Sequence, residues 1–476
     1  MLKYFSAYIF LSVLIFANGK PTSIDKEIMN LSLNYDFDKA DQLLAEEFNK
    51  TENLKNHFIF LNVELLKVIK ATDEVPYNQK RAIKDSLNNI LIKYAENVVE
   101  KYEDKELSIY EKFYFGSIHG VLGRLYGVSK SWTSAFSSGK EGRDLMEEII
   151  EEKPDFTDAY LIIGMMNYYA DRMGGFIEFV ASILGLSGDR DIGLTYLEKV
   201  EKEGDFNNWQ AAMILIELYS RLEGNKFASL PLLEKMVERF PDNTHFLNWY
   251  CYDLMSMHYF NKLEKIINQN ENKVNDYIKA AFYHNKGEYG KSNKLYEKLL
   301  SEKSNIFPWI HENAKYLRAL NHFYLDNDKI ANELKEGLNE NYTNQINTFI
   351  ANKELTKKIF EFRKSVLFDN QFEINKHIAD SINYKKTNRS ESVFNYYLGV
   401  YYFKIDNLLE AEKQFLNAKK LNFKNFGYPS IRYLIHIYKT IDVSEDKVEN
   451  LLDEISDQDN ESLEFFAQDL EKKYDL

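Results

Sequence analysis

Apolar residues recur every three or four positions along most of the chain, which is the spacing of one face of an α-helix. The clearest example lies near the C-terminus, where Gly399 is followed by Tyr402, Ala411, Phe415 and Ala418. Two helices that cross closely need small side chains at the crossing, and Gly399 and Ala411 meet that need. Tyr402 and Phe415 would fill the space on either side. This stretch therefore predicts one antiparallel helical hairpin.

The same layout recurs, in more degenerate form, at four other places in the chain. Each copy has a small residue early in its second helix and a larger side chain four positions later. The copies lie at Phe37 to Leu44, Gly142 to Pro154, Gly224 to Pro241, and Gly287 to Leu299. The stretches 76–101 and 353–384 also show helical spacing and no strand alternation. We therefore predict an all-α fold, an α-solenoid of antiparallel helical hairpins in which each repeat packs on its neighbours.

The pattern divides the chain into four stretches. We expect a leader at 1–19, N-terminal helical repeats at 20–110, a central repeat region at 111–305 with an apolar insert at 171–190, and C-terminal repeats with acidic capping helices at 306–476.

Composition agrees with a helical chain and limits its partners. The 476 residues include only 20 Gly and 7 Pro, the two residues that interrupt helices most strongly. The net charge of −14 argues against nucleic acid as a partner, because an acidic surface repels phosphate backbones. The densest basic run, Lys385, Lys386 and Arg389, is short and is interpreted as a solvated loop.

The offsets of Gly399, Ala411 and Phe415 resemble those of a tetratricopeptide-repeat (TPR) hairpin. Residues 113–223 resemble more specifically an uncharacterised group of exported bacterial TPR proteins. The shared features are Gly116 to Gly120, Pro154 to Gly164, and the turn Gly188-Asp189-Arg190 to Gly193-Leu194. The last two are also similar to a eukaryotic TPR family linked to mitochondria and lipid droplets. The resemblance implies a TPR-like superhelix and says little about function.

An insert distinguishes the central region. Gly164 and Gly193 lie 29 positions apart, where an ordinary hairpin places its small residues 12 apart. The extra apolar helix either packs on the solenoid as additional core or lines a pocket for an apolar ligand, a peptide or lipid. Asp189 is predicted to cap the helix that follows, and Arg190 to pair with a carboxylate nearby.

The N-terminus is typical of a secretory signal peptide, with Lys3, an apolar stretch from Tyr4 to Phe16, and small residues before Lys20. An uncleaved anchor is the alternative, although the apolar stretch is short for one. No cysteine lies at the cleavage site for lipidation, and Cys251, the single cysteine, is predicted to be a buried core thiol. We expect no other transmembrane segment. The protein is therefore expected in a periplasm or outside the cell, with peripheral association with the envelope as a further alternative.

No catalytic or cofactor-binding motif is present: the sequence has no P-loop, nucleophile elbow or dinucleotide fingerprint. His311-Glu312 begins like a zinc-protease helix, but Lys315 stands where the second histidine belongs. The sequence therefore predicts no enzyme, no cofactor and no metal site. A carboxylate pair assembled from distant helices, as in helical-toroid enzymes, is the remaining alternative.

We expect a scaffold or adaptor that binds a protein or peptide on its concave face. The alternative is a carrier or receptor for a small apolar or glycan ligand near 174–187. The candidate contact residues are aromatic, amide or basic side chains on helices lining that face or on the insert: Tyr168, Tyr169, Phe176, Phe179, Arg190, Tyr219, Asn248, Tyr252, Tyr283 and Tyr401.

Overall fold

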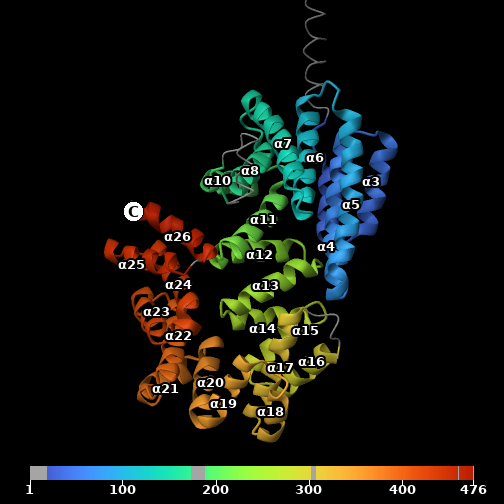
Figure 1. Ribbon diagram of the computed structural model, residues 1–476. Helices are drawn as coiled ribbons and strands as arrows, with labels where there is room; N and C mark the ends of the chain where they lie inside the picture. The colour runs from blue at the N-terminus through green and yellow to red at the C-terminus, as the bar shows by residue number, and fades with distance from the viewer. Residues whose placement is uncertain (1–18, 173–187, 302–306, 459, 475–476) are drawn as a thin grey trace, which may run out of the picture. The chain divides into compact units, whose positions relative to one another are not determined.

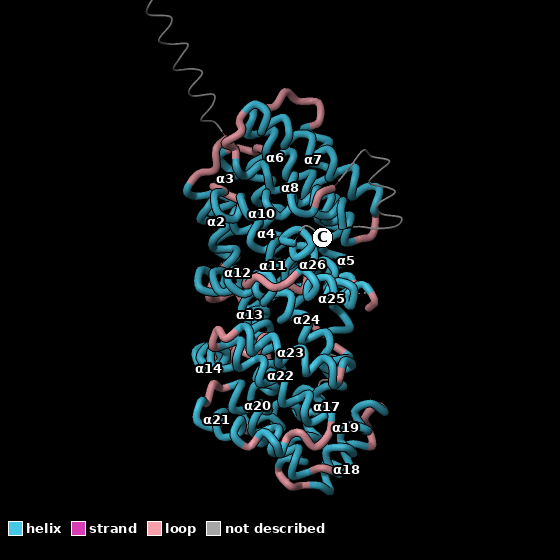
Figure 2. The backbone as a smooth tube through the Cα atoms, turned by 90° about the vertical axis from the view of Figure 1, so that its left-hand side faces the viewer, coloured by secondary structure: helices cyan, strands magenta, loops and turns pink. Residues whose placement is uncertain are grey.

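The computed structural model describes residues 19–172, 188–301, 307–458 and 460–474. Within these residues the chain forms 24 α-helices and no strand, and 82% of it is helical (Figures 1 and 2). Consecutive helices pack as antiparallel pairs, which confirms the predicted all-α helical array. No described helix is both long and apolar enough to cross a membrane.

The chain divides into two compact units. The first comprises the chain up to Leu215 together with Glu238–His245. Its helices are α2 (Ser23–Leu33), α3 (Phe37–Lys50), α4 (Leu54–Glu74), α5 (Tyr77–Tyr102), α6 (Ile109–Val128), α7 (Trp132–Glu152), α8 (Tyr160–Arg172), α10 (Arg190–Glu203) and most of α11 (Asn208–Glu217).

The second unit comprises Ile216–Val237 and Phe246–Leu476. It includes a π-helical turn at Leu218–Leu222. Its helices are most of α12 (Lys226–Arg239) and of α13 (Thr244–Ser256), and the whole of α14 (Phe260–Gln269), α15 (Asp276–Lys286), α16 (Tyr289–Ser301), α17 (Pro308–Tyr324), α18 (Asp328–Lys335), α19 (Glu340–Ala351), α20 (Lys353–Leu367), α21 (Gln371–Ala379), α22 (Asn388–Lys404), α23 (Leu408–Leu421), α24 (Phe423–Thr440), α25 (Glu445–Ser456) and α26 (Glu461–Tyr474).

Small residues lie where paired helices cross, as the repeat pattern predicts. In the α22–α23 pair, a Cβ atom on Gly399 would lie 2.9 Å from the ring of Phe415, and Ala411 is fully buried. In the α8–α10 pair, a Cβ atom on Gly193 would lie 2.9 Å from the carbonyl oxygen of Gly164. Such approaches leave no room for a side chain, so glycine sets the distance between the two backbones.

The helix after the insert begins as predicted. Asp189 Oδ1 accepts hydrogen bonds from the backbone N–H groups of Asp191 and Ile192, both at 2.9 Å, and so caps α10. Arg190 Nη1 lies 2.7 Å from Asp191 Oδ1, which supplies the expected carboxylate. Most of the insert, including residues 173–187, lies outside the described residues.

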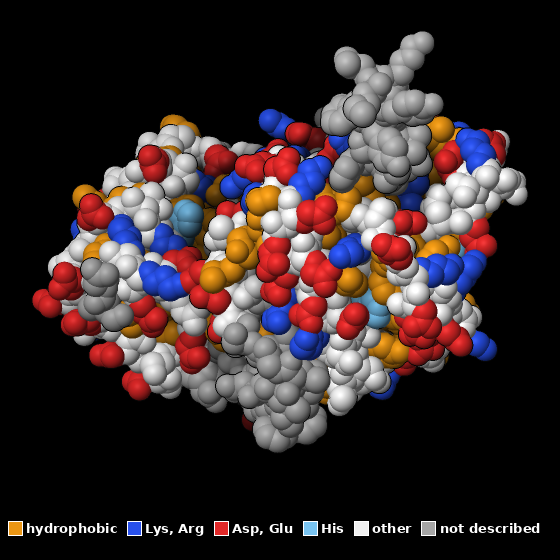
Figure 3. All heavy atoms as spheres, turned by 90° about the horizontal axis from the view of Figure 1, so that it is seen from above, with side chains coloured by type: hydrophobic (Ala, Val, Ile, Leu, Met, Phe, Trp, Pro, Cys, Tyr) orange, Lys and Arg blue, Asp and Glu red, His pale blue; other side chains and the backbone are white. Residues whose placement is uncertain are grey.

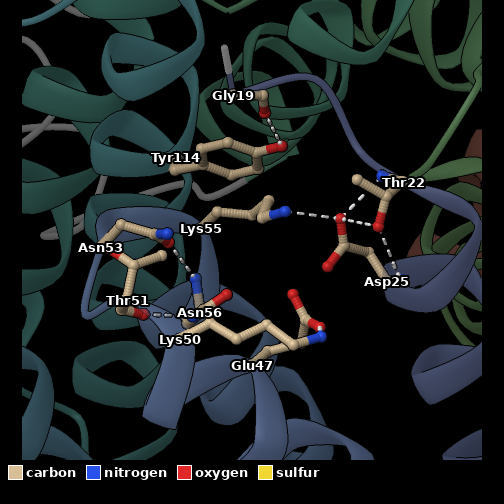
Figure 4. Close-up of polar contacts among 10 residues, drawn as sticks. All are labelled: Gly19, Thr22, Asp25, Glu47, Lys50, Thr51, Asn53, Lys55, Asn56 and Tyr114. Atoms are coloured by element: carbon tan, nitrogen blue, oxygen red, sulfur yellow. Dashed lines mark hydrogen bonds and ion pairs between the residues drawn. The ribbon is translucent and has the colours of Figure 1, made fainter.

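A buried carboxylate fixes the start of the first unit (Figure 4). Asp25 is fully buried, accepts from Thr22 N–H at 2.6 Å in a capping box, and lies 2.8 Å from Lys55 Nζ. Tyr114 Oη donates to the Gly19 carbonyl at 2.7 Å, as Figure 4 also shows. These contacts tie the first described residues to α4 and α6. The buried Asp25 carboxylate obtains from them the counter-charge and the hydrogen bonds that a buried charge needs.

Cys251 lies inside α13 and is fully buried, as predicted. Burial raises the pKa of its thiol to about 12, so the side chain stays a neutral thiol and packs like a small apolar group.

Candidate functional site

A hollow of about 670 Å³ lies within the second unit. Five helices contribute to its wall: α17, α19, α20, α22 and α24. The lining residues are Tyr324, Asn341, Asn344, Gln345, Thr348, Phe349, Asn352, Leu355, Thr356, Ile359, Phe360, Arg363, Thr387, Arg389, Ser390, Val393, Tyr397, Asn422, Lys424, Asn425 and Phe426.

Helical spacing explains how two of these walls are built. On α19, Asn344 and Gln345 each lie three or four positions from Asn341 and from Thr348, so the four side chains share one broad face. On α20, Ile359 and Phe360 are placed in the same way between Thr356 and the cation Arg363. The first wall is an array of amides and hydroxyls, and such groups can both donate and accept hydrogen bonds.

Aromatic rings close part of the hollow. The rings of Tyr324 and Phe360 lie 4.6 Å apart, and Tyr324 stacks on Tyr289 at 5.3 Å. Burial raises the pKa of the Tyr324 hydroxyl to about 12, so it stays neutral at physiological pH. The hollow therefore combines apolar ring surface with hydrogen-bonding side chains, as sites for small molecules and peptide segments commonly do.

Three cations line the hollow and no carboxylate does. Arg363 lies 5.5 Å from the ring of Tyr397, and Arg389 lies 4.8 Å above the ring of Phe349. Lys424, in the first turn of α24, is exposed. Within the described part of the chain, none of the three forms an ion pair with a carboxylate.

Arg363 is the most constrained of the three cations. Its Nη2 donates to Asn285 Oδ1, while its Nε is buried and makes no hydrogen bond to any described residue. Nδ1–H of the neighbouring His284 donates to Asn321 Oδ1 at 2.6 Å, and burial lowers the pKa of His284 to about 4. His284 is therefore neutral at physiological pH and leaves Arg363 as the charge on this wall.

Two helix N-termini add to the positive character of the hollow. Thr387, Arg389 and Ser390 belong to the start of α22, and Asn422, Lys424 and Asn425 to the start of α24. The N-terminal end of a helix carries a partial positive charge from its free N–H groups. Both ends therefore reinforce the charges of the side chains beside them.

Two other parts of the surface carry charges of both signs. Figure 3 shows acidic side chains spread over the face in view, interleaved with basic ones. A second hollow of about 580 Å³, in the first unit, contains Glu27 as well as Lys26 and Arg239. There Lys26 pairs with Asp205 and Arg239 donates to Asn30 Oδ1 at 3.0 Å. Its cations are thus already occupied by neighbouring side chains.

The predicted contact residues in the first unit are Tyr168, Tyr169 and Arg190. Tyr168 is fully buried and meets the ring of the half-buried Tyr169 edge-on at 5.5 Å. Arg190 is buried beside Asp191. Phe176 and Phe179 lie outside the described residues.

The other five candidates belong to the second unit, where Asn248 and Tyr252 share α13 and the remaining three lie on different elements. Tyr219 and Tyr401 are buried, Tyr252 is 40% exposed, and Tyr283 is half-buried. Asn248 accepts from Asn275 N–H at 2.6 Å and so orders the loop before α15. None of the eight described candidates lines the hollow, and their role in contacting a partner stays a prediction.

The sequence carried a weak signal for the hollow. Residues 338–355 are rich in Asn, Thr and Gln at helical spacing, which is unusual for a helix that only packs. Lys385 and Lys386 lie in an exposed turn, as interpreted from the sequence, whereas Arg389 is the second residue of α22 and lines the hollow.

Within the described ranges, no group of three or more His, Cys, Asp or Glu side chains is placed to hold a metal ion. No family model matches the chain, and no curated protein matches it. The geometry of the hollow is therefore the basis for a functional conclusion.

Proposed function

We propose that this protein is a non-enzymatic scaffold that binds a peptide segment of a partner protein in the hollow of its second unit. The observation that carries the proposal is the hollow itself, with an amide and hydroxyl wall on α19 facing aromatic and cationic side chains. Amides can pair with both the N–H and C=O groups of a peptide backbone, and the rings offer apolar contact.

We also propose that the helical hairpins are tetratricopeptide-like repeats. The close crossings at Gly399 with Phe415 and at Gly164 with Gly193 support a TPR-like array, because they place small residues at the positions that such hairpins require. The resemblance of residues 1–19 to a signal peptide supports the proposal that the protein is exported to a periplasm or beyond the cell. Peptide capture needs no cofactor and no metal ion.

Photo-cross-linking in the source cells tests the proposal. A photoreactive amino acid replaces Asn344, which is exposed and lines the hollow, or Asn347, which is exposed on the same helix outside the hollow. We expect a discrete protein adduct from position 344 and none of that size from position 347. The same adducts from both positions, or none from either, would contradict partner binding in the hollow.

A carrier or receptor for a small polar ligand is the second candidate. The volume of about 670 Å³ supports it, because pockets for small molecules span about 300–1,000 Å³. Native mass spectrometry of the purified full chain distinguishes the two: a co-purifying small molecule, without a protein adduct at position 344, would favour the carrier. A ligand site near 174–187 stays a prediction outside the described residues.

A further inference from the structure

The charge balance of the hollow departs sharply from that of the protein. The chain carries 74 acidic and 60 basic residues, yet the lining of the hollow contains Arg363, Arg389 and Lys424 and no Asp or Glu. Three unpaired cations facing one space repel one another, and an anionic ligand would relieve that repulsion.

The two arginines are held in place by contacts that leave their charge uncompensated. Asn285 and the ring of Tyr397 position Arg363, and the ring of Phe349 positions Arg389. An amide oxygen and aromatic faces orient a guanidinium without neutralising it. A guanidinium already fixed in direction loses less side-chain entropy when it binds a carboxylate.

A fourth cation without a carboxylate partner in the described part of the chain belongs to the same unit. Arg432, on α24, has no carboxylate partner among the described residues, and its guanidinium lies close to Tyr396, whose ring is 5.0 Å from that of the lining residue Phe426. Lys404 on α22, by contrast, is paired with Asp369 at 2.9 Å. Arg432 therefore adds a further positive charge to α24, one of the helices that build the hollow.

We propose that the peptide segment bound in the hollow is acidic, and that its Asp or Glu side-chain carboxylates pair with Arg363, Arg389 and Lys424. This inference rests on the proposed function and names the chemistry of the partner. The acidic exterior of the protein would repel such a segment elsewhere, so the same charge pattern gives both attraction and selectivity.

Fluorescence anisotropy with the full chain tests this pairing. The probes carry a neutral dye and are hexaglutamate with both ends blocked, hexaglutamine with both ends blocked, and hexaglutamine with a free C-terminal carboxylate. We expect blocked hexaglutamate to bind at least about tenfold more tightly than blocked hexaglutamine, and its affinity to fall as the NaCl concentration rises.

The variant Arg363→Gln/Arg389→Gln/Lys424→Gln should lose at least about tenfold in affinity for hexaglutamate. The control Lys385→Gln/Lys386→Gln/Lys420→Gln removes the same charge from exposed positions outside the hollow and should change affinity by less than about twofold. Circular dichroism verifies the fold of both. Because Arg363 also contacts Asn285, the variant Arg389→Gln/Lys424→Gln, which keeps that contact, should show the same direction of change.

Equal affinity for hexaglutamate and blocked hexaglutamine would overturn the acidic preference and leave peptide binding intact. Binding of only the hexaglutamine with a free carboxylate would overturn the assignment to side chains. Equal losses in the charge variant and its control would place the peptide elsewhere. If the proposed function itself were wrong, the photo-cross-linking experiment would give no specific protein adduct at position 344. That outcome does not depend on how the charged and neutral peptides compare.

Discussion

At the scale of single residues, burial decides the protonation of several histidines. His119 on α6 is 9% exposed, its Nδ1 is buried without a hydrogen-bond partner among the described residues, and burial lowers its pKa from 6.5 to about 4. The neutral ring meets the ring of Phe115 edge-on at 4.8 Å. Protonation would place an uncompensated charge in this packing.

The sign of the resulting pH dependence follows from the lowered pKa. Between about pH 6.5 and pH 4 the unfolded chain binds a proton at His119 that the folded chain excludes, so acidification favours unfolding. The stabilisation is complete above the unfolded pKa and is lost as the pH falls from there towards the folded value.

We therefore expect the variant His119→Phe to be less sensitive to acid. Between about pH 7 and pH 5 the free energy of unfolding of the unaltered chain should fall by about 2 kcal/mol more than that of the variant. Urea unfolding at both pH values measures this, and the other buried histidines cancel in the difference. Equal falls for the two proteins would show that His119 is protonated in the folded chain.

At the scale of elements, glycine residues determine how closely two crossing helices approach. Gly193 on α10 illustrates this, because an added Cβ atom would meet Tyr168 N at 2.7 Å and Gly164 O at 2.9 Å. Gly290 on α16 is the opposite case, with no atom within 4 Å of an added Cβ. An added methyl group would therefore clash with backbone atoms at Gly193 and would meet open space at Gly290.

The change Gly193→Ala should lower the free energy of unfolding by about 1–3 kcal/mol, because backbone atoms must move apart to admit the methyl group. The matched control Gly290→Ala should raise it by up to about 1 kcal/mol, since alanine loses less backbone entropy in a helix. Chemical denaturation of both variants provides the comparison. Similar effects at the two positions would mean that α8 and α10 do not cross at Gly193.

Features that depend on local spacing were predictable at this scale. The crossing of Gly399 with Phe415, the cap at Asp189 and the burial of Cys251 each follow from a few neighbouring residues whose periodicity is visible in the sequence. Gly287, the first residue of one of the predicted repeat copies, adopts a φ of +86° at the end of α15.

At the scale of the whole molecule, the sequence showed one polar helix face at 338–355 but could not locate the hollow, because the hollow is assembled from segments as far apart as Tyr324 and Phe426. Its position depends on how successive helix pairs stack, which no local pattern encodes. Arg389 shows the difficulty, since beside Lys385 and Lys386 it resembles part of a solvated loop and only the start of α22 turns it towards the hollow. Aromatic residues such as Tyr168 were prominent in the sequence, although the structure uses that ring in the core.

Hydrogen–deuterium exchange on the full chain, with and without blocked hexaglutamate, tests most directly whether the hollow of the second unit is the binding site. Backbone amides exchange more slowly where a ligand suppresses local opening. We predict slower exchange in α19, in α20 around Arg363, and in the first turns of α22 and α24. Slower exchange confined to the first unit, or unchanged exchange in these four helices while the peptide is bound, would contradict the account.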